Sequence, residues 1–206
     1  FRSDAKGKKV LLLFEGAMSE PQVYLNGKKV GEWAYGYSYF YFDVSQFIQE
    51  GANTVAVKLS NKEFASRWYP GAGLYRKVSV IIKNNESIDQ WGQFITTPFI
   101  SDAVAKVNIK TKASGENTRL VTTIFDAEGH KVSAEESSLR FGKEFDQNLK
   151  VENPKLWSPE TPYLYKAVAQ LYVGNELKDE VTTRFGIREI KYEANKGFSL
   201  NGKVTK

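Results

Sequence analysis

The chain has 206 residues, of which 41% are hydrophobic and 14% aromatic, so it can form one large domain or two of about 100 residues each. It has no cysteine, which excludes disulfides, thiol catalysis and cysteine-based zinc sites. Its 29 basic and 24 acidic side chains give a net charge of +5, and the lysines are spread through expected turns rather than gathered in a stripe. Composition therefore favours a solvated globular surface over nucleic-acid binding, and no apolar run of about 18 residues predicts a membrane span.

The first part of the chain, residues 1–84, is predicted to be a β domain. A short continuous apolar run suits a strand buried on both faces, and Asn26-Gly27 predicts a tight hairpin because both residues accept positive φ. Asp43 or Ser45 could cap a brief helical turn over residues 43–48, closed by Gly51. The expected strands cover residues 8–16, 23–25, 28–30, 35–44, 54–59 and 74–83.

A polar, turn-prone stretch at residues 83–86 marks the expected domain boundary, and residues 85–190 form the second predicted domain. Short alternating segments spaced every 8 to 12 residues or so are typical of an immunoglobulin-like sandwich. Without a cysteine pair, its core is expected to depend on apolar packing around Leu156 and Trp157. The expected strands cover residues 103–113, 118–126, 131–139, 141–151, 163–172 and 176–186.

The last residues, 191–206, contain a second Asn-Gly pair, Asn201-Gly202. This pair predicts another hairpin, of which the chain contains only the first arm before Lys206. We therefore expect residues 191–206 to begin a linker into a further domain.

The usual signatures of catalysis are not found. His130 is the only histidine and lies in an expected turn, so we interpret it as a solvated loop residue. Glu15, Asp43, Glu63 and Glu160 have ordinary interpretations as a strand end, a cap, a loop residue and a turn residue, and spacing in a sequence cannot show a glycosidase pair. The sequence also has no phosphate-binding loop or nucleotide fingerprint, so we predict no catalytic residue, metal ligand or cofactor in this chain.

One segment combines aromatic, basic and turn residues in an unusual way: Arg67-Trp68-Tyr69-Pro70-Gly71-Ala72-Gly73-Leu74-Tyr75-Arg76. The proline and the glycines exclude a helix and predict a loop of defined shape. Flat aromatic faces and a guanidinium group can hold a sugar ring or pack one domain against another. Both interpretations stay open, and they do not exclude each other.

Several motifs occur in a distinctive order along the chain. They are Phe14-Glu15-Gly16-Ala17, Val23-Tyr24-Leu25-Asn26-Gly27-Lys28, Ser66 through Arg76, Leu156-Trp157-Ser158-Pro159, Phe185-Gly186-Ile187-Arg188, and Lys196-Gly197-Phe198-Ser199-Leu200-Asn201-Gly202-Lys203. The first three resemble the sugar-binding domain of glycoside hydrolase family 2, in its β-galactosidase branch. The next two resemble the immunoglobulin-like domain of that family, and the last resembles the lead into its (β/α)8 barrel.

The resemblance implies an all-β fold, with a jelly-roll (galactose-binding-like) β-sandwich, N-terminally truncated, followed by an immunoglobulin-like β-sandwich. In the family both catalytic glutamates stand on the barrel, which would lie beyond Lys206. The chain would then be a non-catalytic region that positions the barrel and helps to wall the substrate pocket, inactive alone. The parent enzyme would hydrolyse terminal β-D-galactosides with retention, and an open sheet edge would leave room for oligomerisation.

The resemblance also assigns roles to single residues. The implied partner is a β-galactoside held together with the barrel, with Arg67 bonding sugar hydroxyls and Trp68 and Tyr69 lining the subsite. Pro70, Gly71 and Gly73 would hold the shape of the loop. Some β-galactosidases of the family place an acidic residue that contacts galactose just upstream of this loop; here Ala65 and Ser66 occupy the nearest positions, and Glu63 is a looser candidate for that role.

Two alternatives remain at this point. The first is an autonomous carbohydrate-binding or adhesion-type β module, which would bind sugar without a barrel. The second is the same region of a β-glucuronidase or a β-mannosidase. The periplasm, the cell exterior and the cytoplasm all stay open as the location.

Overall fold

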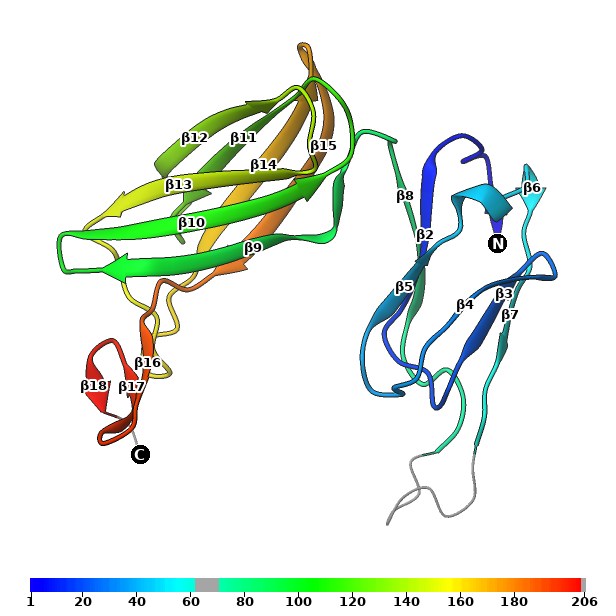
Figure 1. Cartoon of the computed structure of the whole chain (residues 1–206), viewed down its shortest axis with the longest axis horizontal. Helices are drawn as coiled ribbons and strands as arrows, with labels where there is room; N and C mark the ends of the chain where they lie inside the picture. The colour runs from blue at the N-terminus through cyan, green and yellow to red at the C-terminus, as the bar shows by residue number, and fades with distance from the viewer. Residues whose placement is uncertain (62–70, 205–206) are drawn as a thin grey trace. The chain divides into compact units, whose positions relative to one another are not determined.

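The computed structural model describes residues 1–61 and 71–204, and the chain divides into two compact units, residues 1–85 and 86–206 (Figure 1). Within the described residues the regular structure is β-strand, apart from one 3-10 turn, Ser45–Phe47. This confirms the all-β prediction. Nowhere in these two ranges is there a helix with the length and hydropathy that a membrane span requires.

The first unit is built from antiparallel sheets. One sheet has the order β5 (Phe40–Asp43), β2 (Lys9–Phe14) and β8 (Val78–Lys83). The other has the order β4 (Lys28–Glu32), β3 (Gln22–Leu25) and β7 (Val55–Lys58), and β1 (Arg2–Ser3) pairs with β6 (Gly51–Ala52). This arrangement agrees with the predicted β-sandwich.

The hairpin between β3 and β4 forms where the sequence predicts it. Asn26 and Gly27 have φ values of 50° and 80°, as a two-residue turn with positive φ at both positions requires. Asn26 also holds a neighbouring segment, because its Oδ1 accepts a hydrogen bond from Thr54 N at 2.9 Å and its Nδ2 donates to Asn53 Oδ1 at 2.9 Å. The turn residue therefore contributes to tertiary structure as well as to the hairpin.

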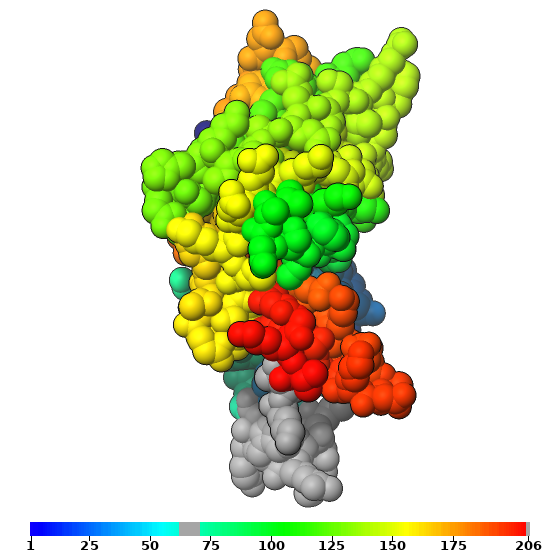
Figure 2. Space-filling model, turned by 90° about the vertical axis from the view of Figure 1, so that its left-hand side faces the viewer, coloured from blue at the N-terminus to red at the C-terminus, as the bar shows by residue number. Residues whose placement is uncertain are grey.

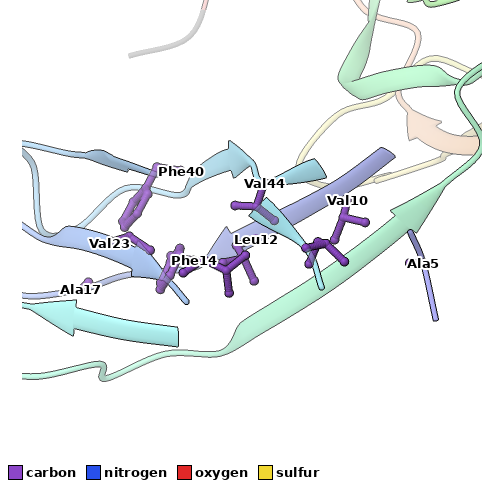
Figure 3. Close-up of a cluster of buried hydrophobic side chains, with 10 residues drawn as sticks. Ala5, Val10, Leu12, Phe14, Ala17, Val23, Phe40 and Val44 are labelled. Carbon is purple, nitrogen blue, oxygen red and sulfur yellow. The ribbon is translucent and has the colours of Figure 1, made fainter. Parts of the chain in front are cut away.

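The core of the first unit lies between its two sheets. Val10, Leu12 and Phe14 project from β2, and Figure 3 shows them along that strand with Val23 beside Phe14. Alternate residues of β2 point to the opposite face, where Leu11 is also buried. The strand is thus buried on both faces, as its continuous apolar run predicts.

Strand β8 leaves part of this interior side open. Register pairs Val78, Val80 and Ile82 with Phe14, Leu12 and Val10, so all six side chains lie on the same side of the sheet. The three β8 side chains are nevertheless 36–47% exposed. In the described part of the chain, β8 is the edge of its sheet and nothing covers this apolar row.

Two expected strands of the first unit are shorter than predicted. The strand expected over residues 35–44 begins only at Phe40, because residues 33–39 turn: Trp33 Nε1 donates to Ser38 Oγ at 2.9 Å, and a Cβ on Gly36 would come within 2.7 Å of Met18 Sδ. The strand expected over residues 74–83 begins at Val78. The helical turn is present, and Asp43 Oδ1 accepts a hydrogen bond from Ser45 N at 3.0 Å at its start.

The second unit is an antiparallel sandwich, as predicted. One sheet has the order β9 (Ile88–Ile100), β10 (Val104–Ala113) and β13 (Glu144–Glu152). The other has the order β12 (Lys131–Leu139), β11 (Thr118–Phe125), β14 (Tyr165–Val173) and β15 (Glu176–Phe185). These seven strands, counted over residues 86–204, match the immunoglobulin-like layout.

Strand β9 is absent from the sequence-based prediction. Its 13 residues do not alternate regularly between buried and exposed positions, and its pairing with β10 shifts register twice. Trp91 within it has a φ of 55°, and Gly92 and Pro98 interrupt its apolar pattern. Because bulges break the period of two, a search for alternation misses this strand.

The core of the second unit differs from the one expected. Its fully buried side chains project from the facing strands and include Ile109, Ile124 and Leu171. Leu156 packs at the margin of this core. Trp157 does not belong to it: a Cβ added to Gly186 would lie 2.7 Å from the Trp157 side chain, and the Arg188 guanidinium lies 4.9 Å from the ring centroid.

The C-terminal residues form a sheet of β16 (Ile190–Glu193), β17 (Gly197–Leu200) and β18 (Lys203–Val204). The expectation of a one-armed hairpin is wrong, because Lys203 and Val204 pair with Leu200 and Ser199 across the Asn201-Gly202 turn. Asn201 Nδ2 donates to Trp157 O at 3.0 Å, and Figure 2 shows these strands in red next to yellow residues of the same unit. The hairpin is therefore tied to the second unit.

Candidate functional site

Sequence analysis places the functional site in the loop of residues 67–73. Its substrate-contacting residues, Arg67, Trp68 and Tyr69, lie outside the described residues, as do Pro70 and Glu63. The structure describes the returning half of the loop, from Gly71 onward. The residues from Gly71 to Arg76 anchor this returning half to the first unit.

Gly71 and Gly73 both have left-handed backbone conformations, with φ values of 73° and 118°. A Cβ added at either position would find no atom within 4 Å, so space does not require glycine there. The requirement is conformational, because L-residues with a side chain rarely adopt these φ values. A side chain at either position would strain the backbone of the loop.

Gly73 also joins the loop to the segment between β2 and β3. Met18 N donates to Gly73 O, and Gly73 N donates to Met18 O, both at 3.1 Å, which forms an isolated antiparallel bridge. Such a two-bond bridge fixes the backbone at one point on each segment. The returning end of the loop is thus attached to the body of the first unit.

Tyr75 provides the next attachment. Its hydroxyl donates to Gly36 O at 2.8 Å, and its ring lies against Gly16, where an added Cβ would approach Tyr75 Cζ and Oη to 2.7 Å. The Arg76 guanidinium lies 5.2 Å from the Tyr75 ring centroid, within the range of a cation–π contact. Tyr75 consequently joins the returning chain to the turn of residues 33–39.

Around Tyr75 the first unit presents a group of partly exposed tyrosines, here called the tyrosine cluster: Tyr35, Tyr37 and Tyr75. The Tyr37 ring meets Tyr75 edge-on with a centroid distance of 6.4 Å, and it meets Tyr35 edge-on at 5.7 Å. The three residues are 42–61% exposed. Rings with an apolar face and a polar tip suit contact with a sugar or with another protein surface.

Sequence analysis interpreted Tyr35 and Tyr37 as part of a strand, and so did not assign them to the site. The available signal was Gly36 between them, since a glycine inside a strand pattern often marks a close backbone approach. Here the Gly36 carbonyl accepts the Tyr75 hydroxyl, and its Cα faces Met18. The glycine thus allows the turn that brings the tyrosines together.

His130, which was weighed as a catalytic residue, makes an ordinary surface contact. The His130 side chain is 78% exposed, and its Nδ1 lies 3.1 Å from Asp126 Oδ2. Nearby, the hydrogen bond from Tyr163 Oη, at 2.7 Å, lowers the pKa of the Glu128 carboxyl. Among residues 1–61 and 71–204, no group of three His, Asp or Glu side chains is arranged to hold a metal ion.

Comparison with known families divides the chain at almost the same place as the structure. Residues 2–91 match the sugar binding domain of glycosyl hydrolases family 2, and residues 87–188 match the domain named glycosyl hydrolases family 2. The two matches overlap at residues 87–91. Together they span both sandwiches.

Individual relatives cover the whole chain but are much longer. The chain is 36% identical to the beta-galactosidase BoGH2A of Bacteroides ovatus over 100% of its own length and 25% of the relative's. It is 34% identical to a putative beta-glucuronidase of Formosa agariphila, again over 100% of the chain and 20% of the relative. The chain therefore spans about a quarter or less of these two relatives.

Solved structures agree with this assignment. A glycosyl hydrolase family 2 member from Bacteroides cellulosilyticus superposes with a TM-score of 0.93 and 33% identity, over 100% of this chain and 30% of that one. A beta-glycosidase from Bacteroides vulgatus gives a TM-score of 0.88 and 29% identity, over 98% of this chain and 26% of that one. With both domain matches in order and both sandwiches in the structure, the chain belongs to glycosyl hydrolases family 2.

Proposed function

We propose that this chain is the non-catalytic N-terminal region of a longer enzyme that hydrolyses terminal β-D-galactosides with retention. The observation that carries the proposal is the full-length match, at 36% identity, to a beta-galactosidase of which it covers 25%. A beta-galactosidase of Thermoanaerobacter pseudethanolicus, 32% identical over 98% of the chain, supports the same substrate. Retaining hydrolysis needs two carboxyl groups about 5 to 5.5 Å apart, and we assign both to the part of the enzyme outside this chain.

In this proposal the first unit completes the substrate pocket. Arg67 bonds sugar hydroxyls, and Trp68 and Tyr69 line the subsite. Support comes from the anchoring of the loop's returning half by the Met18–Gly73 bridge and by the Tyr75 hydroxyl. A loop attached in this way would present its side chains with less loss of conformational entropy on binding.

The second unit and its C-terminal hairpin position the catalytic domain. Asn201 supports this role, because its Oδ1 accepts from Glu189 N at 2.9 Å while its Nδ2 donates to Trp157 O at 3.0 Å. These contacts hold residues 189–201 in one orientation relative to the sandwich. A domain that follows the hairpin would therefore leave from a defined point.

Hydrolysis assays test this division of labour. The purified 206-residue chain is expected to release no p-nitrophenol from p-nitrophenyl β-D-galactoside, whereas the longer protein that contains it should turn this substrate over. Hydrolysis by the chain, absent from a mock preparation, would contradict the non-catalytic assignment.

A comparison of β-D-galactoside and β-D-glucuronide substrates separates the galactosidase proposal from its main alternative, a β-glucuronidase. A second named relative is a putative beta-glucuronidase at 34% identity, close to the 36% of the beta-galactosidase. We expect the longer protein to have a higher kcat/KM for the β-D-galactoside than for the β-D-glucuronide. A preference for the glucuronide would assign the chain to a β-glucuronidase and leave its non-catalytic role intact.

A further inference from the structure

A cleft opens in the first unit at residues of β3, β4 and β7 and of the chain next to these strands. Its volume is about 410 Å³, which lies within the range of small-molecule sites. The side chains that matter for its chemistry are Glu20, Gln22, Glu32, Trp33, Lys58 and Ser60. We call it the Trp33 cleft.

Three polar side chains cross the cleft in a row. Gln22 of β3 is in register with Glu32 of β4 on one side and with Lys58 of β7 on the other. Paired residues of antiparallel strands point to the same side, and Val23, the next residue of β3, points into the core. The row therefore lies on the outer face of the sheet and offers a carboxylate, an amide and an ammonium group side by side.

Two members of this row are oriented by their neighbours. Tyr24 Oη donates to Gln22 Oε1 at 3.2 Å, and Lys29 Nζ lies 2.7 Å from Glu32 Oε2. This ion pair lowers the pKa of Glu32 through the hydrogen bond and the positive charge of Lys29. Glu32 therefore acts as a charged hydrogen-bond acceptor at neutral pH.

Trp33 adds a flat apolar surface beside the row. Its ring is stacked on Phe40, with centroids 5.7 Å apart and planes 14° apart, and its Nε1 donates to Ser38 Oγ at 2.9 Å. Its backbone N donates to Pro21 O at 3.0 Å. Two contacts thus fix the side chain and one fixes the backbone, while the residue is still 41% exposed, so little rotamer entropy remains to be lost when a ligand packs on it.

The opposite wall is equally well defined. Ser60 N donates to Ser19 O at 2.9 Å, and Ser19 Oγ donates to Ser60 O at 2.7 Å. These two bonds connect the end of β7 to the chain entering β3. Hydrogen-bonded backbone therefore borders the cleft both at Trp33 and at Ser60. Because both walls are held in this way, the cleft is a preformed site.

We propose that the Trp33 cleft binds a neutral hexopyranoside. The apolar C–H face of a pyranose would pack on the indole, and its hydroxyls would bond to Gln22, Glu32 and Lys58. Two carboxylates, Glu20 and Glu32, and the ammonium group of Lys58 line the cleft, and Lys29 pairs with Glu32, so the charges around the cleft balance, which suits a neutral ligand. The proposal concerns the first unit alone and does not rest on the function proposed for the longer enzyme.

An NMR titration of the 206-residue chain tests the proposal. The indole N–H signal of Trp33, assigned by its loss in Trp33→Phe, is followed with methyl β-D-galactopyranoside, methyl β-D-glucopyranoside and methyl β-D-glucuronide. At least one neutral glycoside should give a saturable shift with a Kd in the millimolar range, and the glucuronide should bind no more tightly than this glycoside.

Two variants locate the binding. Trp33→Ala lacks the indole signal, so its binding is followed on the backbone amides of Lys58 and Ser60 and should be at least about tenfold weaker. Gln22→Leu, which leaves the stack on Phe40 in place, should weaken binding at least about 3-fold. Trp91 is an exposed tryptophan of the second unit, so Trp91→Phe serves as the matched control. This variant should bind the neutral glycoside with the same affinity as the unchanged chain. If Trp33→Ala loses its dispersed spectrum, Gln22→Leu decides the question.

Three results would overturn the proposal. The first is the absence of a saturable shift with either neutral glycoside up to about 50 mM. The second is unchanged affinity in Gln22→Leu, which would place the ligand elsewhere. The third is tighter binding of the glucuronide than of both neutral glycosides, which would contradict the charge balance that favours a neutral ligand.

Discussion

The two sandwiches close their interiors to different degrees. In the second unit, alternate residues of β10, β11 and β14 are buried along the length of each strand. In the first unit, Val78, Val80 and Ile82 occupy the corresponding inward side of β8 and remain exposed. The first unit also carries the exposed aromatic residues of the tyrosine cluster and of the Trp33 cleft.

Both units bury hydrogen-bonded polar side chains, and in the first unit one such residue is Asn53, whose Oδ1 accepts from Asn26 Nδ2 and Gln49 N, both at 2.9 Å. In the second unit Gln147 is fully buried; its Oε1 accepts from Thr122 Oγ1 at 2.6 Å, and its Nε2 donates to Glu135 O at 3.2 Å and Leu120 O at 3.3 Å. In the first unit the polar row of the Trp33 cleft faces solvent. The units therefore differ in how completely their apolar interiors are closed rather than in whether they bury polar groups.

The largest effect is expected from a cavity in the closed core. Leu171→Ala, at a fully buried position of β14, should lower the free energy of unfolding of the second unit by about 3 kcal/mol. Residue-resolved hydrogen exchange would report this loss in β10, β11 and β14 while the amides of β2 and β3 keep their protection. A loss below about 1 kcal/mol would show that this core is looser than the structure implies.

A somewhat smaller loss should follow when the buried polar network is broken. Gln147→Leu leaves the Thr122 hydroxyl and the Leu120 carbonyl without this partner, which should cost about 2 kcal/mol in urea unfolding. Gln170→Leu is the control: Gln170 lies at a partly exposed position, where it donates to Glu180 and accepts from Tyr172 Oη, and water can replace both bonds, so the change should cost less than about 0.5 kcal/mol. Equal losses in the two variants would contradict a special role for burial.

In the first unit, close packing should be most sensitive at Gly31. A Cβ at this position would lie 2.2 Å from Phe42 Cε1, so Gly31→Ala should destabilise the unit by about 1.5 kcal/mol through overpacking. Combining it with Phe42→Leu should recover part of the loss, because the smaller side chain vacates the space. Thermal unfolding of the single and double variants measures this, and strictly additive losses would argue against the clash.

At the open row of β8 the expected effect is small. Val80→Thr replaces a side chain that is already 36% exposed, and it should change the free energy of unfolding by less than about 0.5 kcal/mol. The same change at the fully buried Val107 should cost about 2 kcal/mol, because it buries a hydroxyl. Comparable losses at the two positions would mean that the β8 row is covered in solution.

The last effect appears as a dependence on pH. Burial raises the pKa of Tyr165 in the folded state. The neutral Tyr165 hydroxyl therefore contributes fully to the stability of the second unit below the ordinary tyrosine pKa of about 10. This contribution is lost as the pH rises through the raised pKa of the folded state. Tyr165→Phe should therefore flatten the alkaline fall in stability of the second unit, although it also loses the bond from Lys155 N. Tyr192→Phe, at an exposed position, should leave the slope unchanged; identical slopes in all three proteins would refute the effect.

Sequence patterns predicted the regular parts of this fold well. Strands with strict alternation, such as β7 and β10, and both Asn-Gly turns follow from local chemistry alone. Strand β9 was missed because bulges remove its alternation, and residues 35–39 were mistaken for strand because a contact with Met18, distant in sequence, decides their turn. Local signals cannot report contacts that only the folded chain creates.

The functional residues show the same limit. The need for glycine at positions 71 and 73 could be read from the loop sequence. The Trp33 cleft could not, because Gln22, Glu32 and Lys58 become neighbours only through strand register. A polar residue on an outer strand face looks like ordinary surface until its cross-strand neighbours are known.

The central functional claim is that the first unit completes the substrate pocket of the longer enzyme. The most direct test is the kcat/KM of that enzyme for p-nitrophenyl β-D-galactoside with and without Arg67→Ala, with Trp91→Phe as the control. We expect Arg67→Ala to lower kcat/KM at least about tenfold, since a hydrogen bond to a sugar hydroxyl would be lost, and Trp91→Phe to have no effect. An unchanged kcat/KM in Arg67→Ala, with the protein folded, would contradict the claim.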